Sequence, residues 1–332
     1  MKYLSLFSGI GGFELGINQA YYERMCTKDS KQGVQGIGNK EGQCGECPDI
    51  CSDRLSCIGF SEIDKYAISI YKKHFPNHKN YGDITKIEAS SLPDFDLLVG
   101  GFPCQAFSIA GKRRGFKDTR GTLFFEIARI IKEKQPRLLL LENVKGLLSH
   151  DKGQTFFTII STLDELGYDV EWQVLNSKNH GVPQNRERVF IIGHLRGTPR
   201  PEVFPFGGTD EEDTRNVGED LSYTIDANYH KGTNTLEKGR RQLIQLNQPV
   251  HSNDRVYSDE GLSPTLNTMQ GGNRQPFIKS DAEIRRLTPT ECERLQGFPD
   301  GWTEGISDTQ RYKCCGNAVT VNVIEDIISK LS

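Results

Sequence analysis

The stretch Gly100–Ser108, with the sequence G-G-F-P-C-Q-A-F-S, places one cysteine in a turn directly after an apolar segment. The glycines allow a sharp bend of the backbone, and Pro103 fixes one dihedral angle immediately before the sulfur. A cysteine in such a turn can act as a nucleophile, although many cysteines are simply small buried hydrophobic residues. Both roles are therefore open for Cys104 until the rest of the chain is considered.

A strand, a glycine-rich turn and a helix open the chain. Residues 3–7 form a short apolar run, S-G-I-G-G follows, and a helical pattern extends from Phe13 to about Tyr22. Glycines let a ligand approach the backbone closely, and the N-terminus of a helix offers unpaired N–H groups. The spacing is not G-x-G-x-x-G, and no basic residue follows that could hold phosphates. The turn therefore favours an uncharged adenosyl group over a dinucleotide.

Two further polar blocks lie at the ends of apolar segments. A leucine-rich segment, 137–141, leads into Glu142, and the block Q-N-R-E-R at 184–188 leads into another apolar segment. Open α/β sheets bind ligands at the carboxyl ends of their strands, so a carboxylate there is well placed for chemistry. Arg186 and Arg188 alternate, so an extended backbone would put both on one face. A thiol, a carboxylate and two arginines are thus each predicted at a strand end.

Strands and helices alternate along the chain, which predicts an α/β fold with a mostly parallel, doubly wound sheet. The expected strands are 3–7, 57–61, 95–99, 137–141, 170–175 and 188–192. The 332 residues leave room for a second, smaller domain, and residues 200–283 are polar and rich in turns. We therefore predict a catalytic and cofactor-binding domain at 1–195 with an insertion at 24–57, an irregular β-rich domain at 196–305, and a C-terminal segment, 306–332, that returns to the first domain.

The chain resembles the bacterial DNA (cytosine-5)-methyltransferases that depend on S-adenosylmethionine. The matching blocks follow the family's order and span nearly the whole chain: F-S-G-I-G-G at 7–12, S-E-I-D at 61–64, G-D-I at 82–84, G-F-P-C-Q-A-F-S at 101–108, R-G-T-L-F-F-E-I at 120–127, L-E-N-V at 141–144, Q-N-R-E-R-V-F-I-I-G at 184–193, L-T-P-T-E-C-E-R-L-Q-G-F-P at 287–299 and G-N-A-V at 316–319. The resemblance implies a class I methyltransferase with a Rossmann-like catalytic domain and a target-recognition domain. It implies methylation of carbon 5 of a flipped-out cytosine in a specific short duplex DNA sequence.

The resemblance also implies the catalytic roles. Attack of Cys104 on carbon 6 of cytosine would turn carbon 5 into an enamine carbon that can accept a methyl group. Glu142 would stabilise the adduct at ring nitrogen 3, which requires a raised pKa in a partly desolvated pocket. Arg186 and Arg188 could hold the base carbonyl, a phosphate or the catalytic carboxylate. The target base must leave the stacked duplex, because carbon 6 is inaccessible within it.

The family pattern implies the residues that hold the cofactor and the DNA. In the cofactor cradle, Phe7 would pack on the adenine, Glu62 would accept from the ribose hydroxyls and Asp83 from the adenine amino group. The full cofactor set is Phe7, Gly9, Gly11, Gly12, Glu62, Ile63, Asp83, Ile84, Pro103, Leu123, Asn317 and Val319. The basic loop 111–120 is expected to close over DNA phosphates. The DNA set is Ser108, Lys112, Arg113, Arg114, Thr265, Leu266, Gln270 and Arg274.

The insertion at 24–57 is the main departure from the family pattern. It lengthens the spacing from the glycine turn to Glu62 to about 50 residues, against about 20 in a compact unit. Its cysteines have the spacing C-x2-C-x3-C-x5-C, at Cys44, Cys47, Cys51 and Cys57. This resembles a structural zinc or iron–sulfur ligand set, although it matches no standard zinc pattern. A metal site and a metal-free insert with free thiols are both open.

The composition and charge of the chain indicate where the protein acts and what it can bind. The net charge of −3 is unusual for a DNA-binding protein, but the segments 111–120 and 231–241 are locally basic. There is no signal peptide and no apolar run that could span a membrane, and nine cysteines fit a reducing cytoplasm. We expect a monomer in the bacterial cytoplasm or nucleoid that binds double-stranded DNA. It would act beside a cognate restriction endonuclease that it does not contact, or as an orphan or prophage enzyme.

Three other functions can be weighed against this one. A transfer-RNA cytosine-5 methyltransferase uses similar chemistry, but the Cys-Phe-Thr tripeptide of that enzyme is absent from 200–283. A non-catalytic DNA-binding relative would be expected to lack Cys104, Glu142 or the arginines, and all are present. A dehydrogenase would explain the glycine turn but would leave the Pro-Cys-Gln and Glu-Asn-Val blocks without a role. The sequence therefore favours a DNA cytosine methyltransferase.

Overall fold

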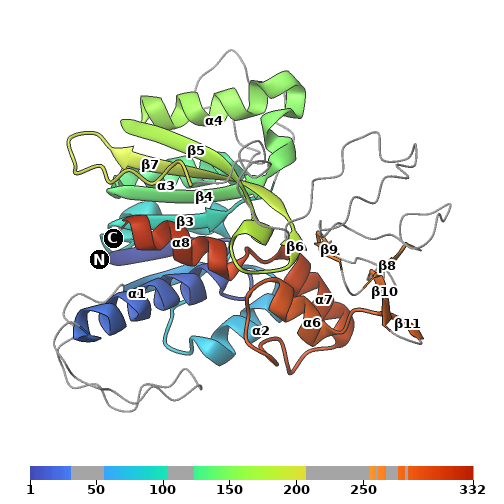
Figure 1. The fold of residues 1–332 in the computed structure, drawn as a ribbon. Coiled ribbons are helices and arrows are strands. Elements are labelled where there is room, and N and C mark those ends of the chain that lie inside the picture. Colours follow the sequence, from blue (N-terminus) through green and yellow to red (C-terminus); the bar gives the residue numbers. More distant parts are fainter. Residues whose placement is uncertain are drawn as a thin grey trace.

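A six-stranded sheet forms the centre of the molecule (Figure 1). The computed structural model describes residues 1–30, 56–103, 123–206, 255–258, 261–266, 276–280 and 283–331. The strand order is β2 (Ser56–Ser61), β1 (Lys2–Leu6), β3 (Leu97–Gly101), β4 (Leu138–Val144), β7 (Glu187–Leu195) and β5 (Tyr168–Asn176). Neighbouring strands are parallel except at β7, which runs antiparallel to β4 and β5. The predicted α/β fold with a mostly parallel sheet is confirmed, and all six predicted strands are present with shifted ends.

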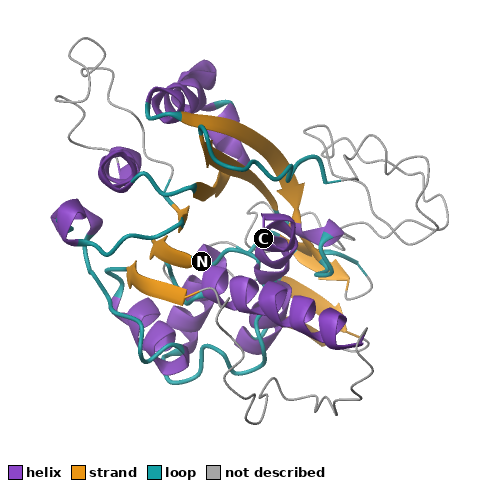
Figure 2. Cartoon of the chain, turned by 90° about the vertical axis from the view of Figure 1, so that its left-hand side faces the viewer, coloured by secondary structure: helices purple, strands orange, loops and turns teal. Residues whose placement is uncertain are grey.

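Helices cover both faces of this sheet (Figure 2). The helices α1 (Gly12–Ser30) and α8 (Val321–Leu331) pack on one face, and α3 (Leu123–Lys134) and α4 (Gln154–Glu165) pack on the other. The run of leucines in β4 serves both layers, because alternate side chains of a strand point to opposite faces. Leu138 and Leu140 join the core under α1 and α8, while Leu139 and Leu141 join the core under α3 and α4.

The remaining elements lie around one edge of this sheet. They are α2 (Lys65–His74), α6 (Pro289–Leu295) and α7 (Asp308–Asn317), a parallel pair β6 (Gln184–Asn185) and β9 (Ser263–Pro264), and a three-stranded sheet of β8 (Val256–Ser258), β10 (Phe277–Ser280) and β11 (Glu283–Arg286). Trp302 packs in a cluster with Ile70 of α2, and its indole N–H donates to the carbonyl of Ile10 at 2.9 Å. The part of the chain before α7 therefore already contacts the N-terminal region. No helix among the described residues combines the length and apolar character that a membrane crossing needs.

The helices α1 and α8 approach each other so closely that a glycine is needed between them. A Cβ atom at Gly16 would lie 2.7 Å from Cβ of Ile324 and 2.8 Å from the carbonyl oxygen of Val321. Alanine is more favourable than glycine inside a helix by about 1 kcal/mol, but overpacking costs about 1–3 kcal/mol. Because the backbone oxygen cannot move without shifting α8, the steric cost should outweigh the gain in helix propensity.

We therefore expect Gly16→Ala to lower the free energy of unfolding by about 1–2 kcal/mol, measured by urea denaturation. Gly146→Ala is the matched control, because a Cβ atom there has no neighbour within 4 Å among the described residues. The control should unfold at the same urea concentration as the unmodified protein. An unfolding midpoint for Gly16→Ala equal to or above that of the control would show that the two helices have room for the methyl group.

Candidate functional site

A cavity of about 590 Å³ opens at one edge of the sheet, where residues that follow β1, β2, β3 and β4 come together. Parallel strands bring their carboxyl ends to the same edge, and the antiparallel β7 brings its amino end there. The volume is in the range of sites for drug-sized or nucleoside-sized ligands. Ten residues that the sequence predicts for catalysis, cofactor or DNA line this cavity: Phe7, Gly9, Glu62, Pro103, Glu142, Arg186, Arg188, Thr265, Leu266 and Asn317.

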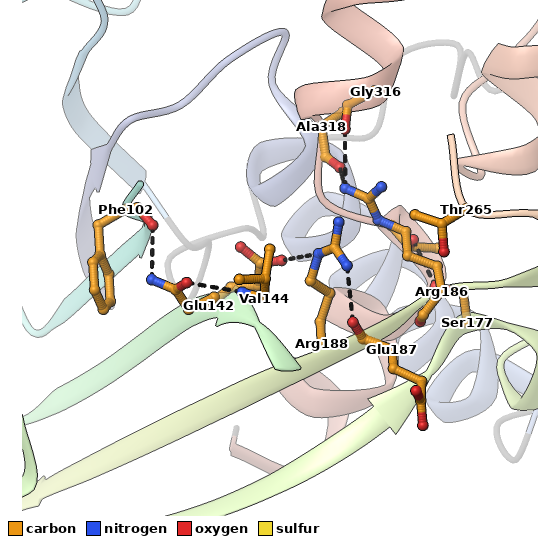
Figure 3. Close-up of polar contacts among 12 residues, drawn as sticks. Phe102, Glu142, Val144, Ser177, Arg186, Glu187, Arg188, Thr265, Gly316 and Ala318 are labelled. Atoms are coloured by element: carbon orange, nitrogen blue, oxygen red, sulfur yellow. Dashed lines mark hydrogen bonds and ion pairs between the residues drawn. The ribbon is translucent and has the colours of Figure 1, made fainter. Parts of the chain in front are cut away.

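Glu142 and Arg188 form an ion pair in the cavity wall. Arg188 lies opposite Val144 in the β4–β7 ladder, and Glu142 lies opposite Phe190, so both side chains project from the same face. The distance from Arg188 Nε to Glu142 Oε1 is 3.0 Å, and both side chains are largely buried (Figure 3). Burial raises the pKa of Glu142, and the positive charges of Arg188 and Arg186 oppose this effect without cancelling it. The direction is the one that the sequence predicts for a proton-donating carboxyl group.

The backbone on the other side of Glu142 is closely packed. A Cβ atom at Gly101, the residue opposite Glu142 in β3, would lie 3.1 Å from Glu142 Oε2. Asn143 is 2% exposed, and its side-chain amide donates to the carbonyl of Phe102 at 2.9 Å while its oxygen accepts from the N–H of Val144 at 2.8 Å. Asn143 thereby fixes the end of β3 just before Pro103, the last described residue ahead of Cys104.

Arg186 connects three separate segments of the chain through hydrogen bonds. It is 2% exposed, and its guanidinium donates to the carbonyl of Leu266 at 3.2 Å. It also donates to the carbonyls of Gly316 at 3.2 Å and Ala318 at 2.8 Å (Figure 3). Three buried hydrogen bonds to carbonyls leave this side chain little freedom to turn toward a ligand. The alternating arginines of the Q-N-R-E-R block therefore have different surroundings, because Arg188 faces the carboxylate and Arg186 holds the segments that carry Leu266 and Asn317.

Glu62 organises the glycine turn. Its Oε2 accepts from the N–H of Gly9 at 2.9 Å, and its Oε1 accepts from the N–H groups of Ile63 and Asp64, both at 2.8 Å. A carboxylate offers about four acceptor positions, so one remains for a ligand hydroxyl. Phe7 lines the cavity beside it with a φ of 55°, a left-handed conformation that is uncommon for a bulky residue. An aromatic wall beside a carboxylate with a spare acceptor position fits an adenosine group.

Asp64 and Lys313 also line the cavity, and the site predictions do not include them. The distance from Lys313 Nζ to Asp64 Oδ2 is 2.5 Å, across 249 residues of sequence. Asp64 belongs to the quoted block S-E-I-D, so its place beside the cofactor turn could have been inferred from its neighbour Glu62. Nothing in the sequence pairs it with Lys313, because that contact depends on how α7 packs against α2.

Seven predicted cofactor residues lie outside the cavity lining that the described residues form: Gly11, Gly12, Ile63, Asp83, Ile84, Leu123 and Val319. A Cβ atom at Gly11 would lie 2.6 Å from the Phe75 ring, and one at Gly12 would lie 2.8 Å from Cγ1 of Val319. These two glycines therefore permit packing of the polypeptide itself. The other four residues have different surroundings. Ile63 is 73% exposed, Ile84 is in the core, and Leu123 is partly buried at the start of α3. Asp83 caps a short helical turn by accepting from the N–H of Thr85 at 3.0 Å.

Thr265 and Leu266 are held by the strand that precedes Arg188. The Thr265 hydroxyl donates to the carbonyl of Asn185 at 2.6 Å, next to the β6–β9 pairing. Leu266 is 1% exposed and packs with Leu287 and Leu295. The Leu266 side chain therefore faces a hydrophobic cluster, whereas Thr265 is exposed at the cavity.

Several predicted residues lie outside the described part of the chain: Cys104, Ser108, Lys112, Arg113, Arg114, Gln270, Arg274, Cys44, Cys47 and Cys51. The fourth cysteine of the predicted metal set, Cys57, lies in β2, and its thiol donates to the carbonyl of Gly59 at 3.3 Å. Burial, together with the nearby Glu14 carboxyl, raises the pKa of the Cys57 thiol to about 12. Within the described residues, no group of three or more histidine, cysteine or acidic side chains is arranged to hold a metal ion.

Comparison with known proteins places this site in context. A match to the family described as C-5 cytosine-specific DNA methylase spans residues 1–332. The type II methyltransferase M1.ScrFI of Lactococcus lactis subsp. cremoris is 39% identical over 335 residues, which cover 99% of this chain and 77% of that protein. The orphan methyltransferase M.SPRI of Bacillus phage SPR is 31% identical over 457 aligned positions, covering 100% and 97%. The crystal structure of the S. pombe Dnmt2 methyltransferase superposes with a TM-score of 0.61 at 16% identity, covering 99% and 97%, and so supports the fold.

Proposed function

The chain belongs to the C-5 cytosine-specific DNA methylase family, and within that family we propose which of its residues carry out each part of the reaction. The enzyme methylates carbon 5 of cytosine in double-stranded DNA and depends on S-adenosylmethionine. The observation that carries the assignment of residues is the buried Glu142–Arg188 pair in the same cavity as the glycine turn and Glu62. The cavity therefore offers a proton-donating carboxyl group beside a nucleoside-binding wall.

The cavity fits S-adenosylmethionine by its volume and by the residues that line it. Phe7 offers an aromatic surface for the adenine, Glu62 a free acceptor position for the ribose, and Asn317 a polar side chain on the opposite wall. The bound cofactor supplies a methyl group on a sulfonium centre, which needs an electron-rich carbon as its partner. Gly9, Pro103 and these three residues are the ones we propose to hold it. We propose Gly11, Gly12 and Val319 as the packing that shapes the turn. We propose Ile63, Asp83 and Leu123 as further cofactor contacts, with the buried Ile84 supporting Asp83 from the core.

We propose that Cys104 adds as the thiolate to carbon 6 of a flipped-out cytosine. The new sulfur–carbon bond breaks the ring's aromaticity and moves electron density to carbon 5. Glu142 donates its proton, or a strong hydrogen bond, to ring nitrogen 3 and so stabilises the adduct. Once carbon 5 is methylated, it loses its proton, and the electron pair of that bond expels the thiolate from carbon 6. Asn143 supports this chemistry by fixing the Phe102 carbonyl two residues before the nucleophile.

We propose different roles for Arg188 and Arg186. We propose that Arg188 orients the Glu142 carboxyl and contacts the base, because its Nε lies 3.0 Å from Glu142 Oε1 at the cavity wall. Arg186 acts through other residues, because the three hydrogen bonds of its guanidinium among the described residues go to backbone carbonyls. Its role in the reaction is to hold the segment of Leu266 and the residues on either side of Asn317 in place around the base.

For DNA, we propose that Ser108, Lys112, Arg113 and Arg114 contact phosphates, and that Thr265, Gln270 and Arg274 contribute to target recognition. The Leu266 side chain is buried, so we propose that it anchors the segment of Thr265 in the protein and does not itself contact DNA. We retain the domain division at 1–195, 196–305 and 306–332 as a proposal. The Trp302 contacts with Ile10 and α2 favour a return to the catalytic domain before residue 302, slightly earlier than this division has it.

The biological setting follows from the relatives as a further proposal. Relatives named as type II methyltransferases and as an orphan methyltransferase of a phage both match, so we propose that the chain acts either beside a restriction endonuclease or without one. We propose that it acts as a monomer in the bacterial cytoplasm or nucleoid and does not touch the endonuclease. A transfer-RNA substrate has no supporting residue, because no Cys-Phe-Thr tripeptide occurs in 200–283.

A structural zinc or iron–sulfur site in the insertion is a separate proposal. Its support is the spacing of Cys44, Cys47, Cys51 and Cys57. The Cys57 thiol donates to the carbonyl of Gly59, so a metal would have to displace that hydrogen bond and the thiol proton to bind the sulfur.

The proposed nucleophile can be tested with DNA that contains 5-fluorocytosine. Fluorine at carbon 5 cannot leave as a proton does, so the enzyme should remain covalently attached in the presence of S-adenosylmethionine. We expect a denaturation-resistant adduct on gels with the unmodified protein and none with Cys104→Ser. A transfer-RNA substrate with the same base should give no adduct. An adduct that persists in Cys104→Ser would assign the attack to another residue.

A further inference from the structure

The cavity has two walls that come from opposite ends of the chain. Phe7, Gly9 and Glu62 lie in the N-terminal wall, next to the start of α2, while Gly316 and Asn317 lie in the C-terminal wall, at the end of α7. A ligand that touches both walls is bound only when they are held at the right separation. The question is which contact sets that separation.

The Lys313–Asp64 ion pair joins the two walls inside the cavity. The distance from Lys313 Nζ to Asp64 Oδ2 is 2.5 Å, and both residues line the cavity. The Lys313 and Asp64 side chains are 31% and 28% exposed, so water screens this pair less than a fully exposed one. Partial burial alone would raise the pKa of Asp64, but the hydrogen bond from Lys313 and two backbone N–H groups lower it overall. The hydrogen bond to Asp64 also raises the pKa of Lys313, so both groups stay charged at neutral pH.

Asp64 is fixed on its own side, so Lys313 is held by an immobile partner. The other oxygen of Asp64 caps α2 by accepting from the N–H of Tyr66 at 2.9 Å. The N–H of Asp64 donates to Glu62 Oε1 at 2.8 Å, so the carboxylate proposed for the ribose and the acceptor of Lys313 are linked. The charge of Glu62 also acts on Lys313 and raises its pKa further. The ammonium group of Lys313 therefore lies in the field of two carboxylates at the cofactor turn.

We propose that the Lys313–Asp64 pair is a clasp that holds the C-terminal wall of the cavity against α2, which makes both residues positioning residues for S-adenosylmethionine. The proposal rests on the function proposed above. Lys313 lies four residues before Asn317 in α7, about one helical turn, so fixing its end fixes the side chain that faces the cofactor. We expect the clasp to act on affinity for the cofactor, because it joins the glycine-turn side of the cavity to the helix that carries Asn317.

The test compares Lys313→Met, Asp64→Asn and the double variant. Asparagine is as good an N-cap as aspartate, so Asp64→Asn keeps the α2 cap and removes only the charge. We expect each single variant to raise the Kd for S-adenosylmethionine about three- to ten-fold, the scale of a partly buried ion pair. The double variant should be no weaker than the single ones, because both changes break the same contact. Calorimetric titration gives Kd, and methylation assays should show a raised KM with kcat unchanged at saturating cofactor.

Lys134→Met is the matched control. It removes the same charge from an ion pair with Asp94, at 3.2 Å, that does not line the cavity. The control should bind the cofactor as the unmodified protein does. Equal Kd values for Lys313→Met and the control would overturn the clasp, even if the variant melted at a lower temperature.

A direct contact between Lys313 and the cofactor carboxylate would give a different pattern. Asp64→Asn would then free Lys313 and leave Kd unchanged or lower it, while Lys313→Met alone would raise Kd, and this result would also overturn the clasp. Titration of the unmodified protein with S-adenosylhomocysteine tests the proposed function by itself. Failure of that binding would overturn both proposals. If the unmodified protein binds and the variants have the same Kd, only the clasp is overturned.

Discussion

Replacement of Glu142 by glutamine is expected to lower kcat for methyl transfer about 10²–10⁴-fold, the usual contribution of a general acid. The amide of glutamine can donate a hydrogen bond to ring nitrogen 3, but it cannot transfer a proton. The side chain keeps its size, so the contact with Gly101 and the packing of β4 should be preserved. Incorporation of labelled methyl groups into duplex DNA measures kcat, and the Kd for S-adenosylmethionine should stay nearly the same.

The pH dependence of the reaction should change in the same variant. Burial raises the folded-state pKa of Glu142, so the protonated, donating form persists to higher pH than for an ordinary glutamate. As pH rises through that pKa, the proton is lost and kcat of the unmodified enzyme should fall. Glu142→Gln has no proton to lose at this position, so its residual rate should lack the alkaline decline.

The matched control for this experiment is Glu187→Gln, at the start of β7. The Glu187 carboxylate pairs with Lys145 at 2.7 Å, and Arg188 uses only the Glu187 backbone carbonyl. Loss of the Glu187 charge should therefore leave kcat within a few-fold of the value for the unmodified enzyme. Full activity of Glu142→Gln, or an equal loss in both variants, would mean that the buried carboxyl group is not the acid.

The sequence located the six strands, although not their exact ends, because hydrophobic runs and polar boundaries are local signals. Glu142 and Arg188 were both expected at strand ends, and both line the cavity. The direction of β7 is not a local signal, and no residue pattern in 187–195 distinguishes a parallel from an antiparallel neighbour. That direction is what brings Arg188 to the same edge as Glu142.

Contacts between distant segments could not be predicted from spacing. Arg186 and Arg188 are equivalent in an alternating pattern, but the carbonyls of Gly316 and Ala318, 130 and 132 residues away, bind only Arg186. The glycine turn shows the same limit. Gly11 and Gly12 satisfy a ligand-binding motif, yet the atoms nearest to a Cβ there belong to Phe75 and Val319. A short side chain is required in either case, so residue type alone cannot distinguish the two roles.

Replacement of Glu14 by glutamine is expected to stabilise the protein at pH 8 by up to about 3 kcal/mol. Glu14 lies in the first turn of α1 and is 0% exposed, and neither carboxylate oxygen has a hydrogen-bond partner within the described residues. Burial raises its pKa from 4.5 to about 7; the nearby Ser5 and Tyr71 hydroxyls reduce the effect, but neither is placed to form a hydrogen bond with the carboxylate. A shift of this size corresponds to about 3 kcal/mol, because each pKa unit is worth about 1.4 kcal/mol.

The sign follows from the direction of the shift. The folded state holds the proton more tightly than the unfolded state, so protonated Glu14 costs nothing extra below about pH 4.5. As pH rises from there, the unfolded chain gains stability by ionising, and the folded protein loses relative stability until about pH 7, where Glu14 ionises in the fold as well. Glutamine cannot ionise, so the variant and the unmodified protein should be about equally stable near pH 4.5 and should diverge above it.

Urea denaturation at several pH values between 4.5 and 8 measures this divergence. Glu165→Gln, at the exposed end of α4, is the control for loss of one negative charge and should follow the unmodified protein at each pH. Parallel stability curves for Glu14→Gln and the unmodified protein would mean that the carboxyl group is already compensated, for example by a buried water between Ser5 and Tyr71. A divergence confined to pH 4.5–7 would instead identify Glu14 as a buried acid, beneath the cofactor turn, whose charge has no compensating partner. Its presence would then lower the free energy of unfolding at neutral pH.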